Sequence, residues 1–111
     1  MSSAKTSKEI TVVARSRALP GKEKEWESAL RAVVAPTHRE QGCLKYTLHR
    51  GVKDPSLMVV LERWSSQADL DRHLAAPHIR DLFEKAARLA HPGDIAVYEQ
   101  LEEGAPAQGR F

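Results

Sequence analysis

Five consecutive apolar residues in the middle of the chain limit its possible folds more than any other feature: Leu57-Met58-Val59-Val60-Leu61. Successive side chains of a β-strand point to opposite faces of the sheet, so a strand with this sequence needs apolar cover on both sides. Such segments are typical of strands in the middle of a sheet. We therefore predict a central strand that continues through Glu62, Arg63 and Trp64.

Three other segments carry strand patterns. Residues 10–17 are rich in β-branched side chains and end at Leu19-Pro20-Gly21, which indicates a strand followed by a turn. Residues 44–48 alternate between apolar and polar side chains, as a strand with one solvated face does. Residues 95–100 follow the stop signal His91-Pro92-Gly93 and form the last predicted strand.

Two segments carry the spacing of amphipathic helices. Apolar side chains recur every three or four residues over residues 22–37 and again over residues 66–90. Pro36 falls inside the first segment and should kink or shorten it, and Gly42 should end it. Pro77 should break the second segment or start a new helix at its first turn.

The resulting order, β-α-β-β-α-β, predicts an α+β fold of the ferredoxin-like type. In this plan a four-stranded antiparallel sheet carries its helices on one face. The other face is left bare, although the helices that cover Met58 and Val60 cannot also hide Leu57, Val59 and Leu61. A second copy of the chain, packed sheet against sheet, is the simplest cover, so we expect a homodimer.

Length and composition predict one domain in a chain of 111 residues. We expect a disordered N-terminal segment over residues 1–8, the folded domain over residues 9–103, and a flexible C-terminal tail over residues 104–111. No signal peptide is evident and no apolar run approaches the ~18 residues of a membrane span. We therefore expect a cytoplasmic protein without membrane contact.

Charge and cysteine content exclude several functions. The 17 basic and 15 acidic residues are interspersed, so nothing favours nucleic-acid binding. A single cysteine excludes an intramolecular disulfide and a four-cysteine zinc site.

A set of short motifs resembles the antibiotic biosynthesis monooxygenase family over roughly residues 9–101. In chain order the motifs are Leu19-Pro20-Gly21 with Trp26, Glu40-Gln41-Gly42-Cys43-Leu44-Lys45-Tyr46, Asp54-Pro55, Glu62-Arg63-Trp64, Leu70, His73 and Pro77-His78. The resemblance implies a dimeric α/β barrel. It also implies one of three activities: cofactor-independent oxygenation of quinols or anthrones, haem degradation, or isomerisation of a sugar phosphate. Several branches use an asparagine on the first strand, whereas this chain contains no asparagine, which weakens the haem-degrading alternative most.

Three residues are candidates for catalysis. His73 lies in line with Leu70 on the apolar side of its predicted helix, and His78 follows Pro77 at a helix start. Imidazole titrates near neutral pH and can act as a general base, although core or structural roles fit both histidines too. Trp64 could form a flat apolar wall with an N–H donor, or simply pack in the core. No third ligand has a matching spacing, so we expect no metal site.

Four further residues are candidates for binding a substrate. Tyr46 and Tyr98 lie on strands and could point toward the helices, where core packing is the alternative role. Phe83 would line a dry cavity, and Arg15 or Tyr46 could hold a developing oxyanion. Arg63 is expected to pair with Glu62 or Asp69 on the surface, or to reach an anionic substrate.

The function that we expect is oxygenation of a quinol or anthrone-like aromatic substrate by O₂, with no cofactor. The first alternative is a sugar-phosphate isomerase of quorum-signal breakdown, for which Arg15, Arg17 and Arg80 could bind the phosphate. The second alternative is a dimeric ligand-binding or stress protein without catalysis. O₂ consumption, anaerobic turnover and ligand-induced stabilisation without turnover distinguish the three.

Overall fold

The computed structural model of the chain describes residues 8–111, so the predicted disordered segment 1–8 lies outside the described residues except for Lys8. The elements along the chain are β1 (Ile10–Arg17), α1 (Glu23–Ala32), α2 (Val34–His38), β2 (Cys43–Arg50), β3 (Leu57–Trp64), α3 (Gln67–Leu74), α4 (Pro77–Leu89), β4 (Asp94–Tyr98) and α5 (Pro106–Gly109).

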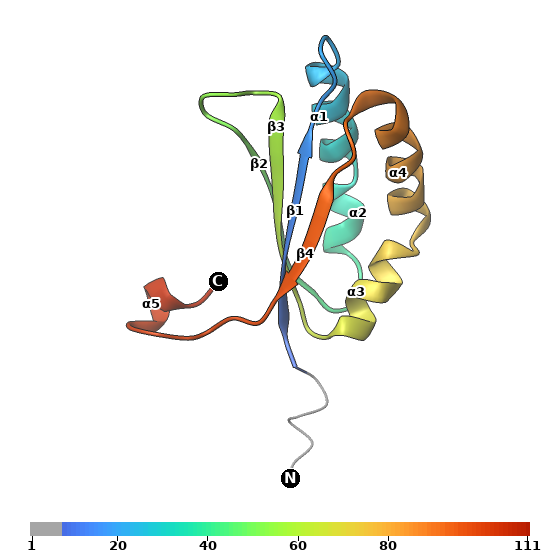
Figure 1. The fold of residues 1–111 in the computed structure, drawn as a ribbon. Coiled ribbons are helices and arrows are strands. Elements are labelled where there is room, and N and C mark those ends of the chain that lie inside the picture. The colour runs from blue at the N-terminus through green and yellow to red at the C-terminus, as the bar shows by residue number, and fades with distance from the viewer. Residues whose placement is uncertain (1–7) are drawn as a thin grey trace.

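The four strands form one antiparallel sheet in the order β2-β3-β1-β4. Strand β3 pairs with β2 on one side and with β1 on the other, which confirms the predicted central strand. Helices α1 to α4 all lie on the same face of the sheet (Figure 1). The predicted α+β plan with a four-stranded antiparallel sheet is therefore confirmed.

The two faces of β3 are covered to different extents. Met58, Val60 and Trp64 are buried beneath the helices. The alternate side chains point to the other face, where Leu57 is 37% exposed and Val59 is half-buried. A single chain thus supplies full cover for one face of its central strand only.

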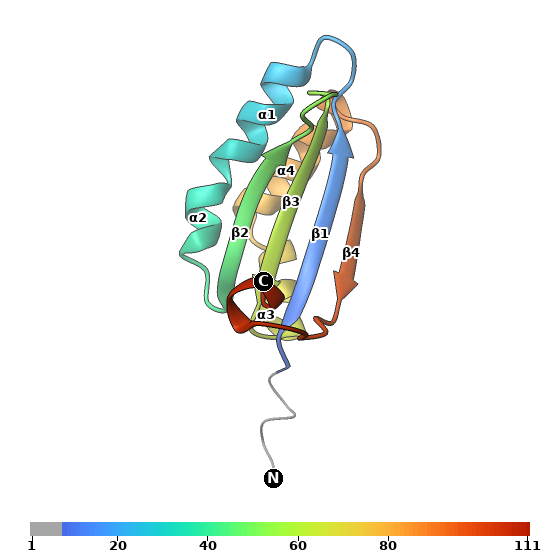
Figure 2. The same ribbon diagram turned by 90° about the vertical axis from the view of Figure 1, so that its left-hand side faces the viewer.

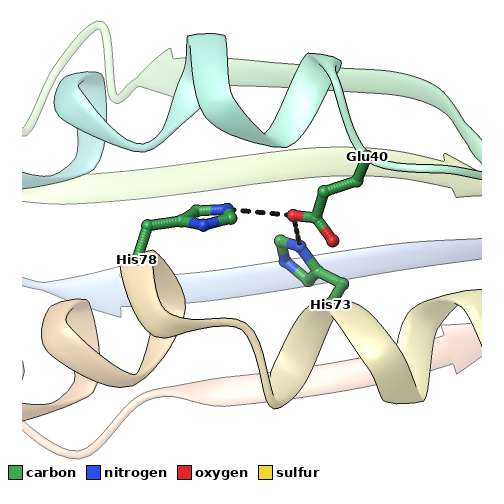
Figure 3. A group of neighbouring side chains, drawn as sticks. All are labelled: Glu40, His73 and His78. Atoms are coloured by element: carbon green, nitrogen blue, oxygen red, sulfur yellow. Dashed lines mark hydrogen bonds and ion pairs between the residues drawn. The ribbon is translucent and has the colours of Figure 1, made fainter.

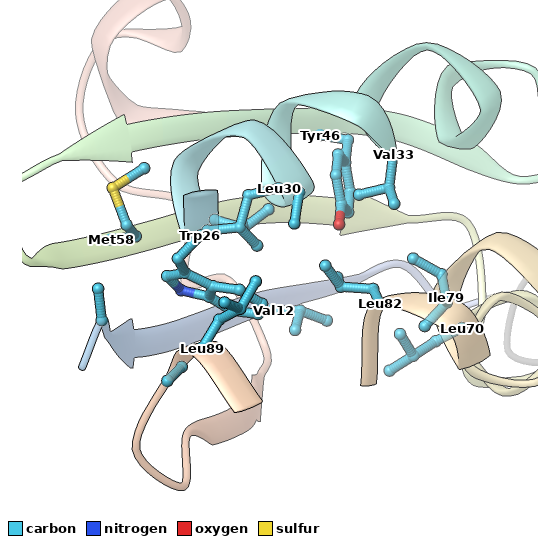
Figure 4. Close-up of a cluster of buried hydrophobic side chains, with 14 of the residues drawn as sticks. Val12, Trp26, Leu30, Val33, Tyr46, Met58, Leu70, Ile79, Leu82 and Leu89 are labelled. Atoms are coloured by element: carbon cyan, nitrogen blue, oxygen red, sulfur yellow. The ribbon is translucent and has the colours of Figure 1, made fainter. Parts of the chain in front are cut away.

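The core fills the space between the sheet and the helices (Figure 4). Val12 of β1 packs there with Trp26 and Leu30 of α1 and with Ile79 and Leu82 of α4, all of them buried. The indole N–H of Trp26 donates to Ser16 Oγ at 2.9 Å, so this large side chain is buried without leaving its donor unpaired.

Pro36 explains the break between α1 and α2. A proline has no backbone N–H to donate to the carbonyl four residues earlier, here that of Ala32, and its ring crowds that carbonyl. The helix is accordingly interrupted at Val33, which lies between α1 and α2. Pro77 stands at the start of α4, after the break that follows α3. Both predicted interruptions are confirmed.

Gly42 fixes the loop that joins α2 to β2. Its φ of 84° lies in the left-handed region, and a Cβ on this residue would overlap the carboxyl group of Asp69. Asp69 lies in the first turn of α3, where its N–H donates to Ser66 Oγ at 3.2 Å. The loop carrying Glu40 is therefore held against the beginning of α3.

The C-terminal segment lies across the face of the sheet away from the helices (Figure 2). Gln100 Nε2 donates to the carbonyl of Gly109 at 2.9 Å, and the N–H of Phe111 donates to Gln100 Oε1 at 3.1 Å. The ammonium group of Lys45 lies 5.6 Å from the centre of the Phe111 ring. The flexibility of residues 104–111 stays a prediction.

Candidate functional site

A cavity of about 240 Å³ lies between the sheet and the helices. Most of its wall is apolar, with side chains from β1, α3 and α4. Seven residues with polar or ionisable side chains also line it: Arg15, Ser16, Tyr46, Glu62, His73, His91 and Asp94. Ligand pockets commonly combine an apolar wall with a few polar groups, so this cavity is the candidate site.

Glu40 joins the two histidines of the helical layer (Figure 3). Its Oε2 lies 2.7 Å from His73 Nδ1 and 2.9 Å from His78 Nε2. His78 Nε2 also lies 3.1 Å from Thr37 Oγ1. One carboxylate oxygen from the loop after α2 thus connects a residue of α3 with a residue of α4.

The contact with Glu40 sets the tautomer of His73. A carboxylate oxygen accepts hydrogen bonds, so the neutral imidazole carries its proton on Nδ1 and keeps a lone pair on Nε2. Burial lowers the pKa of His73, against the opposing attraction of Glu40. The imidazole is therefore neutral near pH 7, which is the form that accepts a proton.

The ring of His73 is held on several sides. Its side chain is only 2% exposed. The centre of the Trp64 ring system lies 4.6 Å from that of His73, and the Tyr46 ring meets it edge-on at 5.5 Å. A base held in this way needs little reorganisation when a ligand enters the cavity.

Glu62 is the most unusual ionisable residue of the cavity wall. Its side chain is 4% exposed, and Oε1 accepts the indole N–H of Trp64 at 2.8 Å. Burial raises the pKa of Glu62 to about 7, the hydrogen bond from Trp64 opposes this rise, and the charge of Glu40 adds to it. Near neutral pH, Glu62 can therefore either give or take a proton.

Sequence reasoning did not select Glu40 or Glu62. The strand period contained a signal for Glu62, since Met58, Val60 and Trp64 share its face. The predicted pairing of Arg63 with Glu62 or Asp69 is wrong. Arg63 points to the opposite face of the sheet, where its Nη2 lies 2.6 Å from Glu9 Oε1.

Four of the predicted site residues line the cavity: His73, Tyr46, Phe83 and Arg15. Burial raises the pKa of the Tyr46 phenol, which keeps the hydroxyl protonated as a hydrogen-bond donor. Phe83 is 45% exposed, and Arg15 Nη2 pairs with Asp94 Oδ2 of the edge strand β4 at 2.9 Å.

The other three predicted site residues lie outside the cavity wall. Trp64 is fully buried behind the wall, in contact with both His73 and Glu62. His78 contacts Glu40 at 2.9 Å, and its ring lies edge-on to that of His73 with 6.2 Å between the centroids. Tyr98 is exposed and pairs in register with Thr11 of β1. Any effect of Trp64 or His78 on a bound ligand would therefore be transmitted by a neighbouring side chain.

Glu40, His73 and His78 also form a group that could hold a metal ion. One ligand atom from each residue lies within 4.8 Å of the others, and two imidazoles with one carboxylate are a common set of zinc ligands. Shared protons explain the same contacts without an ion, because each imidazole can donate to Glu40. The absence of a metal stays a prediction.

The fold and the cavity define a small α+β protein with a single antiparallel sheet and a ligand cavity beneath its helices. The chain belongs to the antibiotic biosynthesis monooxygenase family, whose model matches residues 9–85. The predicted family is thereby confirmed, and family membership supports a monooxygenase-like function that uses a small-molecule substrate and O₂.

The chain is also similar to individual proteins, one of which has a name that agrees with this assignment. "Putative monooxygenase Rv0793" of Mycobacterium tuberculosis is 29% identical over 97 residues, which cover 86% of this chain and 95% of that protein. The crystal structure of PA3566 from Pseudomonas aeruginosa has a TM-score of 0.82 at 33% identity, covering 86% of this chain and 97% of that one. The protein sll1783 of Synechocystis is 27% identical over 94 residues, 84% of this chain, and this chain spans 64% of its length.

Across residues 8–111, every helix is too short or too polar to cross a bilayer.

Proposed function

We propose that this protein is a monooxygenase that inserts one oxygen atom of O₂ into a quinol or anthrone-like aromatic substrate without a metal or flavin. The observation that carries the proposal is the contact of Glu40 with His73 at the wall of an apolar cavity, with 2.7 Å between Oε2 and Nδ1. This contact provides a neutral, oriented base where an aromatic ring can bind away from water.

The first step is removal of a proton from the substrate. Neutral His73 takes the proton of a phenol or of an activated C–H, and Glu40 stabilises the imidazolium that forms. The resulting anion is delocalised over the aromatic system. Apolar surroundings replace bulk water around it, and the Tyr46 hydroxyl is available to donate a hydrogen bond to its oxygen.

The substrate supplies all the electrons. Its anion gives one electron to O₂, and the radical pair combines to form a C–O bond, which leaves a peroxide on the carbon. Loss of the second C–H proton and cleavage of the O–O bond then give a carbonyl and water. For an anthrone, the net reaction converts a CH₂ group and O₂ into C=O and H₂O, so no external reductant is consumed.

The remaining predicted residues take supporting roles in this proposal. Phe83 packs against the substrate at the open side of the cavity, while Arg15 supports the edge of the sheet through its ion pair with Asp94 on the outer face. Trp64 and His78 position His73 and Glu40. Tyr98 belongs to the outer face of the sheet, where we propose that a second chain packs to form a homodimer.

The experiment is O₂ uptake by metal-stripped protein with a panel of quinols and anthrones, run beside His73→Gln and the control His49→Gln, whose side chain is exposed and lies outside the cavity wall. We expect uptake above the autoxidation blank that falls about 100-fold in His73→Gln and persists in the control. Uptake equal to the blank for every compound contradicts the proposal. Turnover of phosphorylated keto-sugars without O₂ would instead favour an isomerase.

A further inference from the structure

Glu62 has a position that the base chemistry of His73 does not explain. It comes from the central strand β3, so it is held by hydrogen-bonded neighbours on both sides. Its side chain is 4% exposed and lines the cavity. A buried carboxyl group is costly to keep unless it is neutral or fully hydrogen-bonded.

The carboxyl group is only half satisfied. Oε1 accepts from Trp64 Nε1 at 2.8 Å, while no side chain or backbone group within residues 8–111 forms a hydrogen bond with Oε2. The second oxygen of Glu62 is therefore available to a ligand in the cavity.

The ionisable groups near Glu62 come from three directions. Tyr46 stands directly opposite it on β2, Glu40 lies on the loop before that strand, and His73 shares the cavity wall from α3. The neighbour on β1 is the apolar Val12. The negative charge of Glu40, together with burial, favours the protonated form of Glu62.

We infer that Glu62 is the catalytic acid that protonates the leaving oxygen when the substrate peroxide breaks down. This inference rests on the proposed function and adds to it the group that converts the peroxide into product. His73 and Glu62 then divide the proton transfers between a base and an acid in one cavity, whose environments push their pKa values in opposite directions.

Two proton transfers accompany the breakdown of the peroxide. The peroxide has been protonated by the imidazolium of His73, so the substrate carbon carries H and O–OH. His73 takes the C–H proton, the C–H electron pair becomes the second C–O bond, and the O–O bond breaks. The departing OH⁻ receives the proton of Glu62 and leaves as water. The proton on His73 is returned to Glu62 when product and water leave.

Glu62→Gln separates this role from packing, because an amide can still accept the Trp64 N–H but cannot deliver a proton. With 1,8-dihydroxyanthrone, we expect the wild type to form one quinone for each O₂. In Glu62→Gln, we expect the quinone yield per O₂ to fall about 100-fold, and the missing oxygen to be recovered as H₂O₂ or as substrate hydroperoxide. Glu62→Asp should recover part of the yield, and the exposed control Glu84→Gln should keep all of it.

A second readout does not depend on turnover. Infrared difference spectra with the non-oxidisable ligand 1,8-dihydroxyanthraquinone should show a protonated carboxyl band that shifts on binding and is missing in Glu62→Gln. Two results would overturn the inference about Glu62 while leaving the proposed function standing. One is an active wild type whose quinone yield is unchanged in Glu62→Gln, and the other is a carboxyl band that does not respond to the ligand. A wild type that takes up no O₂ with any compound overturns the proposed function and this step together.

Discussion

Trp64 donates its indole N–H to the carboxyl group of Glu62, two residues earlier on the same strand, at 2.8 Å. Residues two apart on a strand share a face, so both side chains lie beneath the helices. The indole also packs against His73. One buried aromatic residue thus contacts both ionisable groups that we propose for catalysis.

Replacing Trp64 by Phe should raise the pKa of Glu62 further. The indole N–H stabilises the charged carboxylate and so opposes the effect of burial. We also expect a loss of about 2 kcal/mol in unfolding free energy from the lost hydrogen bond and packing. Carbon-13 NMR titration of the glutamate carboxyl groups and denaturant unfolding measure the two effects.

Trp26→Phe is the matched control, since it also removes a hydrogen-bonded buried indole. It should cost similar stability and leave the titration of Glu62 unchanged. A Glu62 titration that does not move in Trp64→Phe would contradict the assigned cause.

Glu62 should make the protein less stable as pH rises. Its pKa is 4.5 ordinarily and about 7 in the folded protein, so between these values the folded state holds more protons than the unfolded state. The contribution of Glu62 to the unfolding free energy is therefore fully present below about pH 4.5. It is lost as pH rises through about 7, and the total loss is about 3 kcal/mol. The lowered pKa of His73 acts with the opposite sign below its ordinary value of 6.5.

The difference in unfolding free energy between the wild type and Glu62→Gln isolates this effect, because both proteins contain His73. In urea denaturation from about pH 4.5 to about pH 8, the unfolding free energy of the wild type should fall relative to that of Glu62→Gln. Parallel profiles for the two proteins would rule out a raised pKa at Glu62.

Removing the charge of Glu40 should impair His73 as a base. In Glu40→Gln the imidazole loses its carboxylate partner, so its pKa should fall further and its tautomer should no longer be fixed. We expect O₂ uptake to drop about 100-fold. Nitrogen-15 NMR of the histidine rings reports the tautomer directly.

His78→Gln is the comparison that separates the two contacts of Glu40. It removes the 2.9 Å contact and keeps the one with His73. We expect a smaller loss of activity and an unchanged His73 tautomer. Equal losses in both variants would mean that the three residues act as one unit.

The sequence was sufficient for the fold because local signals agreed with one another. The apolar run at 57–61 and the prolines at 36 and 77 each have a strong physical preference, and each has the predicted consequence in the structure. Gly42 was expected to end the helix, but α2 already ends at His38, and the left-handed Gly42 shapes the loop before β2 instead. The open face of β3 also followed from side-chain alternation alone.

The site was harder to predict because its members are far apart in the chain. Glu40 precedes His73 by 33 residues, and only the packing of the loop at Gly42 against α3 brings them together. Glu62 was overlooked because a charged residue beside Arg63 resembles the solvated end of a strand. Its strand period, which places it under the helices, was the stronger signal.

Two glycines with similar backbones should respond differently to alanine. Gly42 and Gly21 have φ values of 84° and 82°, so each Gly→Ala change carries a backbone penalty of about 1 kcal/mol. A Cβ at Gly21 meets nothing within 4 Å, whereas one at Gly42 overlaps Asp69. Gly42→Ala should therefore cost at least about 2 kcal/mol more in chemical denaturation; similar costs would contradict the close packing of the loop against α3.

A charge on the outer face of β3 should prevent self-association. Leu61 is only half-buried there, so Leu61→Glu should leave the core intact while placing a carboxylate in the proposed dimer interface. Sedimentation velocity should show a wild-type dimer and a folded Leu61→Glu monomer. Lys24→Glu on α1 is the control and should remain dimeric. A monomeric wild type at micromolar concentration would exclude the proposed dimer.

Strand β4 pairs with β1 alone, over five residue positions, and it carries Asp94 and Ile95 of the cavity wall. An edge strand with one neighbour is released at a lower free-energy cost than a strand held on both sides. The part of the wall that β4 supplies is therefore easier to open than the part supplied by the central strand β3. One opening motion of β4 should then both admit a flat ring and expose the β4 amides to hydrogen exchange. The entry of substrate therefore depends on the local stability of β4 as well as on the shape of the cavity.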